Sequence, residues 1–170
     1  YGASVPFMRS AVNSDDFSTT ADVLLEVLET YQGQGWNFDL ACCLYPAAPF
    51  VSAKLLQEAC AKILEGDYDC VFPVLPFSYP TQRALCLNQY GIIRMLYPEF
   101  QSVRSQDLEK SYHDSGQFYF LRPPSLFNHK KIFTNHTAAL LLNEMQAHDI
   151  DTEEDWAVAE FKYKFLASRQ

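Results

Sequence analysis

Two apolar runs, FDLACCL (38–44) and CVFPV (70–74), decide the fold class of this chain. The first is short and apolar after its aspartate, which suits a strand buried on both faces, and the second predicts the next strand. Between them lies a helical pattern that begins at the N-cap candidate Ser52 and ends at Gly66. A strand, a helix and a strand joined by connections of this length predict parallel pairing in an α/β sheet.

Further elements are predicted on either side of this unit. Upstream, Ser18 or Thr19 caps a helix that runs to about Gln32. Downstream, the segments 83–87 and 92–97 predict a β-hairpin around the turn at 88–91. Strands are then expected at 116–121, 138–142 and 145–150, and a closing helix at 153–167 whose inner face carries Trp156, Ala159, Tyr163 and Leu166.

Composition limits the class of protein. A chain of 170 residues, 48% hydrophobic and 15% aromatic, suits one folded domain. Its net charge of −8 disfavours non-specific binding to nucleic acid or to an anionic membrane. No apolar run reaches the ~18 residues of a membrane span, and no signal-peptide pattern opens the chain. The 5 cysteines, odd in number and without CxxC spacing, predict reduced, buried thiols in a cytoplasmic protein.

The acidic stretch DIDTEEDW (149–156) is the strongest candidate for a functional site. In an extended segment Asp149 and Asp151 lie on one side and Ile150 turns to the core. Thr152 then caps a helix, and Asp155 completes a capping-box pattern. A pair of aspartates that leads into a helix is typical of Mg²⁺ sites in nucleotide-binding α/β enzymes. Two exposed acids on a loop are the alternative, and these residues alone do not choose between the two.

Other polar residues are weaker candidates. Arg104 could form a bidentate pair with a carboxylate, or it could belong to a solvated connection. Arg83 and Arg9 could each contact a ligand or be surface charges. The 4 histidines have no metal-ligand spacing, and no phosphate-binding loop or nucleophile elbow is found.

Eight segments together match one enzyme family in the right order along the whole chain. They are YGASVPFMR (1–9), DDFSTT (15–20), CCLYPAAPF (42–50), VFPV (71–74), YPTQRAL (79–85), RSQDL (104–108), YHDSGQFY (112–119) and DIDTEEDW (149–156). In these segments the chain resembles the acylneuraminate cytidylyltransferases, and within them the branch that acts on pseudaminic acid.

The resemblance implies a fold and an activity. The implied fold is a three-layer, mostly parallel α/β sheet of the nucleotide-diphospho-sugar transferase type, with a β-hairpin insertion near 88–112 that reaches into the partner of a homodimer. The implied reaction transfers CMP from CTP to the anomeric hydroxyl of an acidic nine-carbon sugar, a nonulosonic acid, and releases pyrophosphate.

The resemblance also assigns roles to residues. Asp149 and Asp151 match the catalytic Mg²⁺ ligands. On the sugar side, Arg104 matches the residue that binds the sugar carboxylate, and the other substrate-binding candidates are Tyr112, Gln117 and Arg83. The residues implied in nucleotide binding are Arg9, Ser18 and Thr19.

Two departures from the family pattern stand out. The Gly-rich loop of the form Ala-Arg-Gly-Gly-Ser-Lys, which the family places before Tyr-Gly-Ala, is not in this sequence, so residues 1–170 are expected to be a single, N-terminally incomplete domain. The turn Tyr45-Pro-Ala-Ala-Pro49 stands where the family has Gln-Pro-Thr-Ser-Pro. The alternatives are therefore a catalytically inactive, dimeric sugar- or nucleotide-binding module, or a cytidylyltransferase for N-acetylneuraminate or another acidic sugar.

Overall fold

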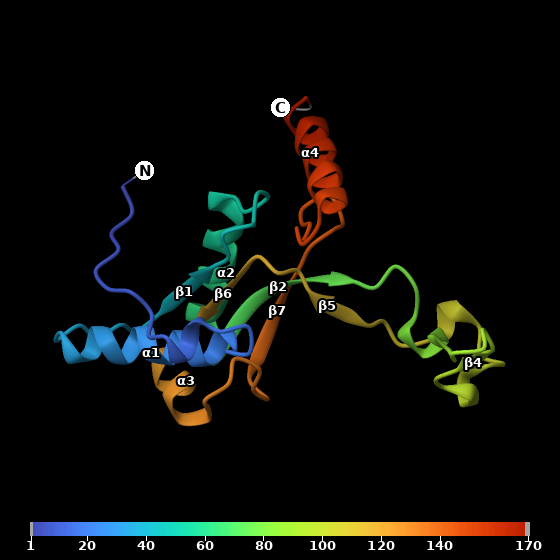
Figure 1. The fold of residues 1–170 in the computed structure, drawn as a ribbon, viewed down its shortest axis with the longest axis horizontal. Coiled ribbons are helices and arrows are strands. Elements are labelled where there is room, and N and C mark those ends of the chain that lie inside the picture. Colours follow the sequence, from blue (N-terminus) through green and yellow to red (C-terminus); the bar gives the residue numbers. More distant parts are fainter. Residues whose placement is uncertain (1, 169–170) are drawn as a thin grey trace.

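Helices lie on both faces of a five-stranded sheet in the computed structural model, which describes residues 2–168 and so omits Tyr1 of the first family segment (Figure 1). Helices α1 (Thr20–Gly33) and α3 (Pro123–His129) cover one face, and α2 (Ala53–Glu65) covers the other. Helix α4 (Glu153–Ala167) projects from the sheet near the end of the chain (Figure 1). The predicted α/β class is confirmed.

The predicted helix starts are confirmed by side-chain caps. Thr19 caps α1 through a capping box with Asp22, and the Ser52 hydroxyl accepts a hydrogen bond of 3.2 Å from the Leu55 backbone N–H. Thr152 caps α4, and Asp155 completes the predicted capping box. Each cap satisfies backbone N–H groups that a helix start leaves without intrahelical partners.

The sheet is mostly antiparallel, so the expectation of a mostly parallel sheet is wrong. Strand β6 (Phe118–Leu121) lies between β1 (Ala41–Leu44) and β2 (Cys70–Pro76) and is antiparallel to both. Strand β5 (Tyr112–Asp114) is also antiparallel to β2, and β7 (Thr137–Leu141) is the strand that pairs with β2 in parallel. The strands β1 and β2 therefore run in the same direction but do not pair, because β6 separates them.

Strand β2 forms the centre of the core, as its apolar sequence predicts. Cys70, Phe72 and Val74 pack in the cluster beneath α1 and α3, whereas Val71 and Leu75 pack in the cluster beneath α2. Side chains alternate between the two faces of a strand, so a strand covered on both faces must be apolar throughout.

Three local expectations are wrong. Residues 145–150 do not form a strand, because the Asn143 and Gln146 side chains bond the local backbone and close a turn there. On α4, Ala159 is buried as expected, but Trp156 and Tyr163 are 61% and 59% exposed. All 5 cysteines are free, as expected, but only Cys70 is buried: Cys43, Cys60 and Cys86 are half-buried, and Cys42 is exposed.

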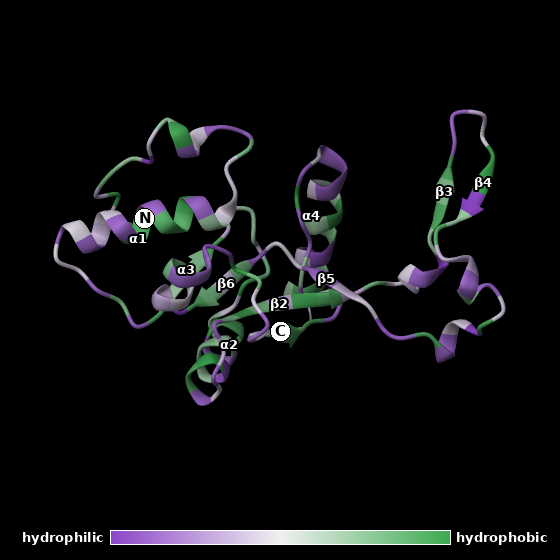
Figure 2. Ribbon diagram, turned by 90° about the horizontal axis from the view of Figure 1, so that it is seen from below, coloured by the Kyte–Doolittle hydropathy of each residue, from purple (hydrophilic) through white to green (hydrophobic). Residues whose placement is uncertain are grey.

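A separate arm, residues 81–111, extends away from the sheet (Figures 1 and 2). It carries the predicted hairpin as β3 (Leu85–Leu87) and β4 (Ile93–Met95), which pair only with each other among the described strands. Short 3-10 turns at Thr81–Arg83, Pro98–Phe100 and Ser105–Asp107 complete it, and a fourth, Val12–Ser14, precedes α1. Within residues 2–168, no helix is long and apolar enough to cross a membrane.

Candidate active site

A polar cavity of about 430 Å³ lies at the carboxyl end of β2, between the turn that joins β5 to β6 and the segment that leads into α4. The carboxyl ends of strands are where α/β proteins commonly bind ligands. The carboxylates that line it belong to Asp114, Glu144, Asp149 and Asp155, and the lysine that lines it is Lys162. The lining therefore carries more negative than positive charge.

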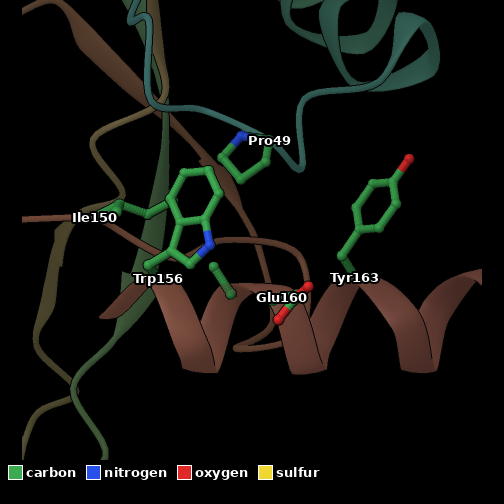
Figure 3. A pocket seen from close by; sticks show the side chains of 6 residues that line it. Pro49, Ile150, Trp156, Glu160 and Tyr163 are labelled. Atoms are coloured by element: carbon green, nitrogen blue, oxygen red, sulfur yellow. The ribbon is translucent and has the colours of Figure 1, made fainter. Parts of the chain in front are cut away.

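Asp149 and Ile150 face different cavities, as predicted, but Ile150 is half-buried and packs in neither core cluster, so its predicted place in the core is wrong. Asp149 lines the polar cavity, whereas Ile150 lines an apolar groove of about 190 Å³ with Trp156 and Pro49 (Figure 3). Asp151 is exposed, does not line the polar cavity, and donates its backbone N–H to Asp155 Oδ2 at 3.2 Å. Within residues 2–168, neither the Asp149 nor the Asp151 carboxylate forms an ion pair or a hydrogen bond with a side chain, so both can accept a ligand.

Gly116 brings the β5–β6 turn against Asp149. Its backbone is left-handed, with φ +65°, and a Cβ atom at this position would lie 3.2 Å from Cγ and from both oxygens of Asp149. A glycine is required for both reasons, since other residues rarely adopt this φ and any side chain would press on the carboxylate. The position of the Asp149 carboxylate thus depends on a residue far away in the sequence.

Lys162 holds the segment that precedes Asp149. From α4, its Nζ donates to the backbone carbonyls of Glu144 at 2.6 Å and Ala147 at 3.0 Å, and lies 3.3 Å from His148 Nδ1. Burial lowers the pKa of Lys162, and Glu144 opposes that shift. Because an ammonium group can only donate, His148 Nδ1 is the acceptor of this bond; the other ring nitrogen, Nε2, lies 3.8 Å from Asp155 Oδ1. The hydrogen bond from Thr152 lowers the pKa of that Asp155 carboxyl.

Replacing Lys162 by methionine is expected to lower the free energy of unfolding by about 1–2 kcal/mol, because the carbonyls of Glu144 and Ala147 lose a charged donor. Chemical denaturation measures this loss. The matched control is Lys164→Met, which removes only an exposed pair with Glu160 of 2.9 Å and should cost less than about 0.5 kcal/mol. Equal losses in the two variants would contradict the role given to Lys162.

The described residues offer few side chains that could together coordinate a magnesium ion. Among residues 2–168, no three His, Cys, Asp or Glu side chains are grouped so as to hold a metal by themselves. Mg²⁺, however, is usually held by one or two carboxylates together with substrate phosphates and water. The Asp149 carboxylate, which lines the cavity and has no ion-pair partner among the described residues, fits such a shared site, in which a nucleotide supplies the remaining oxygens, whereas Asp151 does not line the cavity.

The structure places the other predicted site residues in three regions. Arg9 is exposed, and Ser18 and Thr19 lie at the start of α1, where the Ser18 hydroxyl donates to Asp15 Oδ1 at 2.7 Å. Arg83 and Arg104 lie in the arm, away from the polar cavity (Figure 1). The predicted residues are therefore not gathered at one place within a single chain.

Within the arm, the two arginines have local partners. Arg83 donates from Nη1 to the Gln101 carbonyl at 3.0 Å and from Nη2 to the Val103 carbonyl, so it holds the arm together. Arg104 is 72% exposed and pairs through Nε with Asp107 Oδ2 at 2.7 Å. The Arg104 guanidinium retains free N–H groups, since only Nε has a partner among the described residues.

Tyr112 and Gln117, which the family resemblance assigns to the sugar side, lie close in sequence to residues that line the polar cavity but do not line it themselves. Tyr112 is half-exposed in β5, next to the lining residue His113. Gln117 is 1% exposed, and its Nε2 donates to the Gln146 carbonyl at 2.9 Å, so it fixes the turn that precedes Asp149.

Most of the charged and polar residues that line the cavity were not identified from the sequence as site residues, among them Asp114, His148 and Lys162. Asp114 lies two residues before Gly116, and a tight Asp-x-Gly turn between strands would have been a usable signal. Lys162 follows the buried Ala159 by three positions, so a lysine on the inner face of α4 could have suggested a buried partner.

The chain was compared with known proteins. A scan against protein-family models finds no match. The chain is 35% identical over 164 residues to a pseudaminic acid cytidylyltransferase of Campylobacter jejuni, which covers 96% of this chain and 71% of that protein. It is 31% identical over 151 residues to a Helicobacter pylori protein named pseudaminic acid cytidylyltransferase and UDP-2,4-diacetamido-2,4,6-trideoxy-beta-L-altropyranose hydrolase, covering 88% of this chain and 28% of that one.

A related acid-sugar enzyme also matches. The CMP-N,N'-diacetyllegionaminic acid synthase of Legionella pneumophila is 29% identical over 163 residues, covering 94% of this chain and 69% of that protein. The similarity to the Campylobacter protein extends over almost the whole of this chain and includes the segments around the polar cavity. The chain therefore belongs to the pseudaminic acid cytidylyltransferase family.

Proposed function

We propose that this chain transfers CMP from CTP to the anomeric hydroxyl of a nonulosonic acid, with pseudaminic acid as the first candidate, and releases pyrophosphate. The observation that carries the proposal is the 35% identity over 96% of the chain to a pseudaminic acid cytidylyltransferase. The polar cavity with the unpaired Asp149 supports it, because it offers a place where phosphates and a cation can meet. The similarity to a legionaminic acid synthase makes other acidic nine-carbon sugars the second candidates.

In the proposed reaction, the anomeric hydroxyl attacks the α-phosphorus of CTP. A bond forms between that oxygen and phosphorus, the bond to the bridging oxygen breaks, and pyrophosphate leaves with its electron pair. The hydroxyl proton passes to a carboxylate of the site or to water. The protein's contribution is to position the two substrates and to place charge near the phosphates. Asp149 and Asp151 would hold Mg²⁺, which when bound neutralises phosphate charge.

We also propose that two copies of the chain assemble through the arm. Its hairpin region exposes large apolar side chains with no cover from the rest of the chain: Leu85, Leu87, Tyr90, Ile92, Ile93, Leu96 and Tyr97. An apolar surface of this kind is typical of a protein interface. Light scattering should give the mass of a dimer, and a monomer at micromolar concentration would contradict this assembly.

Arg104 is proposed to bind the sugar carboxylate in the site of the partner, since it lies on the arm and not on the polar cavity of its own chain. Arg104→Ala is expected to raise the KM for the acid sugar by about 10–100-fold, because the carboxylate loses a charged bidentate partner. The KM for CTP should change by less than about 2-fold. Steady-state kinetics with each substrate varied in turn measures both.

A mixing experiment tests whether Arg104 acts across the dimer. Dimers of Arg104→Ala mixed with dimers of Asp149→Asn would exchange subunits and form sites that combine intact Asp149 with intact Arg104. About a quarter of the wild-type activity should return, because half of the dimers are mixed and each has one intact site. No recovery, in protein shown to exchange subunits, would place Arg104 and Asp149 in the same chain's site.

The proposed function itself is tested by pyrophosphate release. The chain is incubated with CTP, Mg²⁺ and pseudaminic acid, and in parallel with N-acetylneuraminate. Turnover with pseudaminic acid is expected to exceed turnover with N-acetylneuraminate. A folded, dimeric protein that binds sugar or nucleotide without releasing pyrophosphate would instead support an inactive binding module.

A further inference from the structure

The turn between β5 and β6 presents a second carboxylate to the polar cavity. Asp114 lines the cavity together with Asp149, although the two are far apart in the sequence. Both carboxylates flank Gly116: Asp114 Oδ1 accepts from the Gly116 N–H at 2.9 Å, and the Asp149 carboxylate lies 3.2 Å from the place that a Cβ of residue 116 would take. Among residues 2–168, no lysine, arginine or histidine forms an ion pair with Asp114.

A partly buried hydrogen-bond network holds Asp114 on the side away from the cavity. The hydroxyl of Tyr119, a residue only 6% exposed, donates to Asp114 Oδ2. The Tyr119 hydroxyl is also hydrogen-bonded to that of Tyr45, which in turn lies 2.6 Å from Thr20 Oγ1 in the first turn of α1. Burial and the bond to Asp114 raise the pKa of Tyr119, so it remains a donor. The network therefore fixes the carboxylate at the cavity through core residues.

The charges around the cavity restrict what Asp114 can bind. Lys162 is engaged with the carbonyls of Glu144 and Ala147, so it does not neutralise Asp114. An anion at Asp114 would be repelled, whereas neutral O–H and N–H groups would find a charged acceptor. Each Asp114 oxygen has one protein donor and keeps capacity for a second bond.

We propose that Asp114 contacts the sugar, accepting a hydrogen bond from a hydroxyl or amide N–H of its uncharged part, and that Tyr119 is a positioning residue for this carboxylate. The inference rests on the proposed function and deepens it. It orients the sugar in the cavity: the neutral substituents face the β5–β6 turn, and the sugar carboxylate points away from Asp114. The region of the site that binds the sugar is thus built on the turn between β5 and β6, two strands that both pair with β2.

The test uses Asp114→Asn, Tyr119→Phe and the double variant, with Asp67→Asn as the control, since Asp67 is exposed and remote from the cavity. Asp114→Asn is expected to raise the sugar KM by about 10-fold, because a charged acceptor is lost. Tyr119→Phe should raise it by about 3-fold, and the double variant should be no worse than Asp114→Asn, since Tyr119 acts through Asp114. The KM for CTP and the half-saturating Mg²⁺ concentration should stay at wild-type values.

Other results would overturn the proposal. If Asp114→Asn and Tyr119→Phe lower the melting temperature but leave the sugar KM unchanged, Asp114 is only a structural partner of Tyr119. If Asp114→Asn shifts the Mg²⁺ requirement as Asp149→Asn does, Asp114 belongs to the metal. Calorimetric titration of the wild type and of Asp114→Asn with pseudaminic acid distinguishes a failure of the proposed reaction from a failure of the proposed role of Asp114. If the wild type binds the sugar tightly but shows no turnover, only the transfer reaction is refuted. If the wild type and Asp114→Asn bind the sugar with equal affinity, the role of Asp114 is refuted.

Discussion

Asp149→Asn is expected to reduce the rate of CMP transfer by about 100-fold or more, because Asp149 is the proposed ligand of a Mg²⁺ ion that stabilises phosphate charge by several kcal/mol. The amide has nearly the shape of the carboxylate but carries no charge, so packing against Gly116 is retained. The remaining activity should no longer increase with Mg²⁺ as it does in the wild type. Rates of pyrophosphate release over a series of Mg²⁺ concentrations measure both effects.

Asp67→Asn is the control for Asp149→Asn, since it removes one negative charge from an exposed residue that does not line the cavity. Its rate and its Mg²⁺ dependence should equal those of the wild type. The two variants should also melt at similar temperatures, because the Asp149 carboxylate has no side-chain partner among the described residues. An unchanged Mg²⁺ titration in Asp149→Asn would remove the metal assignment from this residue.

Gly116→Ala is expected to lower activity by about 10–100-fold, because its methyl group would displace the Asp149 carboxylate by a few tenths of an ångström and misplace a catalytic group. It should also lower the free energy of unfolding by about 1–2 kcal/mol, since an alanine in the left-handed region is strained. Pyrophosphate release and chemical denaturation give the two quantities on the same protein.

Gly35→Ala is the control that separates two effects of an alanine at position 116: the steric contact with Asp149 and the backbone strain of a positive φ. Gly35 also has a positive φ, +87°, but no atom lies within 4 Å of its hypothetical Cβ. The control should therefore lose a similar free energy of unfolding and keep wild-type activity. Full activity in folded Gly116→Ala would mean that the contact with Asp149 does not position the carboxylate for the reaction.

Local patterns were sufficient to predict the elements around which the site is built. Thr19, Ser52 and Thr152 begin helices as their sequences predict, because a cap is decided by a side chain and the backbone a few residues away. The pairing of strands was not predictable in this way. The apolar run of β2 shows that both faces are covered, but it does not show that β6, more than 40 residues further on, enters between β1 and β2.

The residues of the candidate site also divide into those that a local sequence pattern identifies and those that only the tertiary structure identifies. Asp149 was found from the sequence, because two aspartates before a capped helix form a local pattern, and the family resemblance of the surrounding segments is also contained in the sequence. Asp114 and Lys162 were not found, since their importance arises from segments that are distant in the sequence. Asp114 lines the same cavity as Asp149, and Lys162 donates to the carbonyls of Glu144 and Ala147.

The sequence by itself determined the α/β class, the helix starts, the hairpin and the family, all of which depend on short-range periodicity, capping and motifs. Only the tertiary structure decided the antiparallel insertion of β6, the exposure of Trp156 on α4 and the meeting of Asp114, Gly116 and Asp149 at one cavity. The physical reason is that burial and strand pairing depend on which distant segments pack together. The residues next to a position in the sequence do not determine that packing.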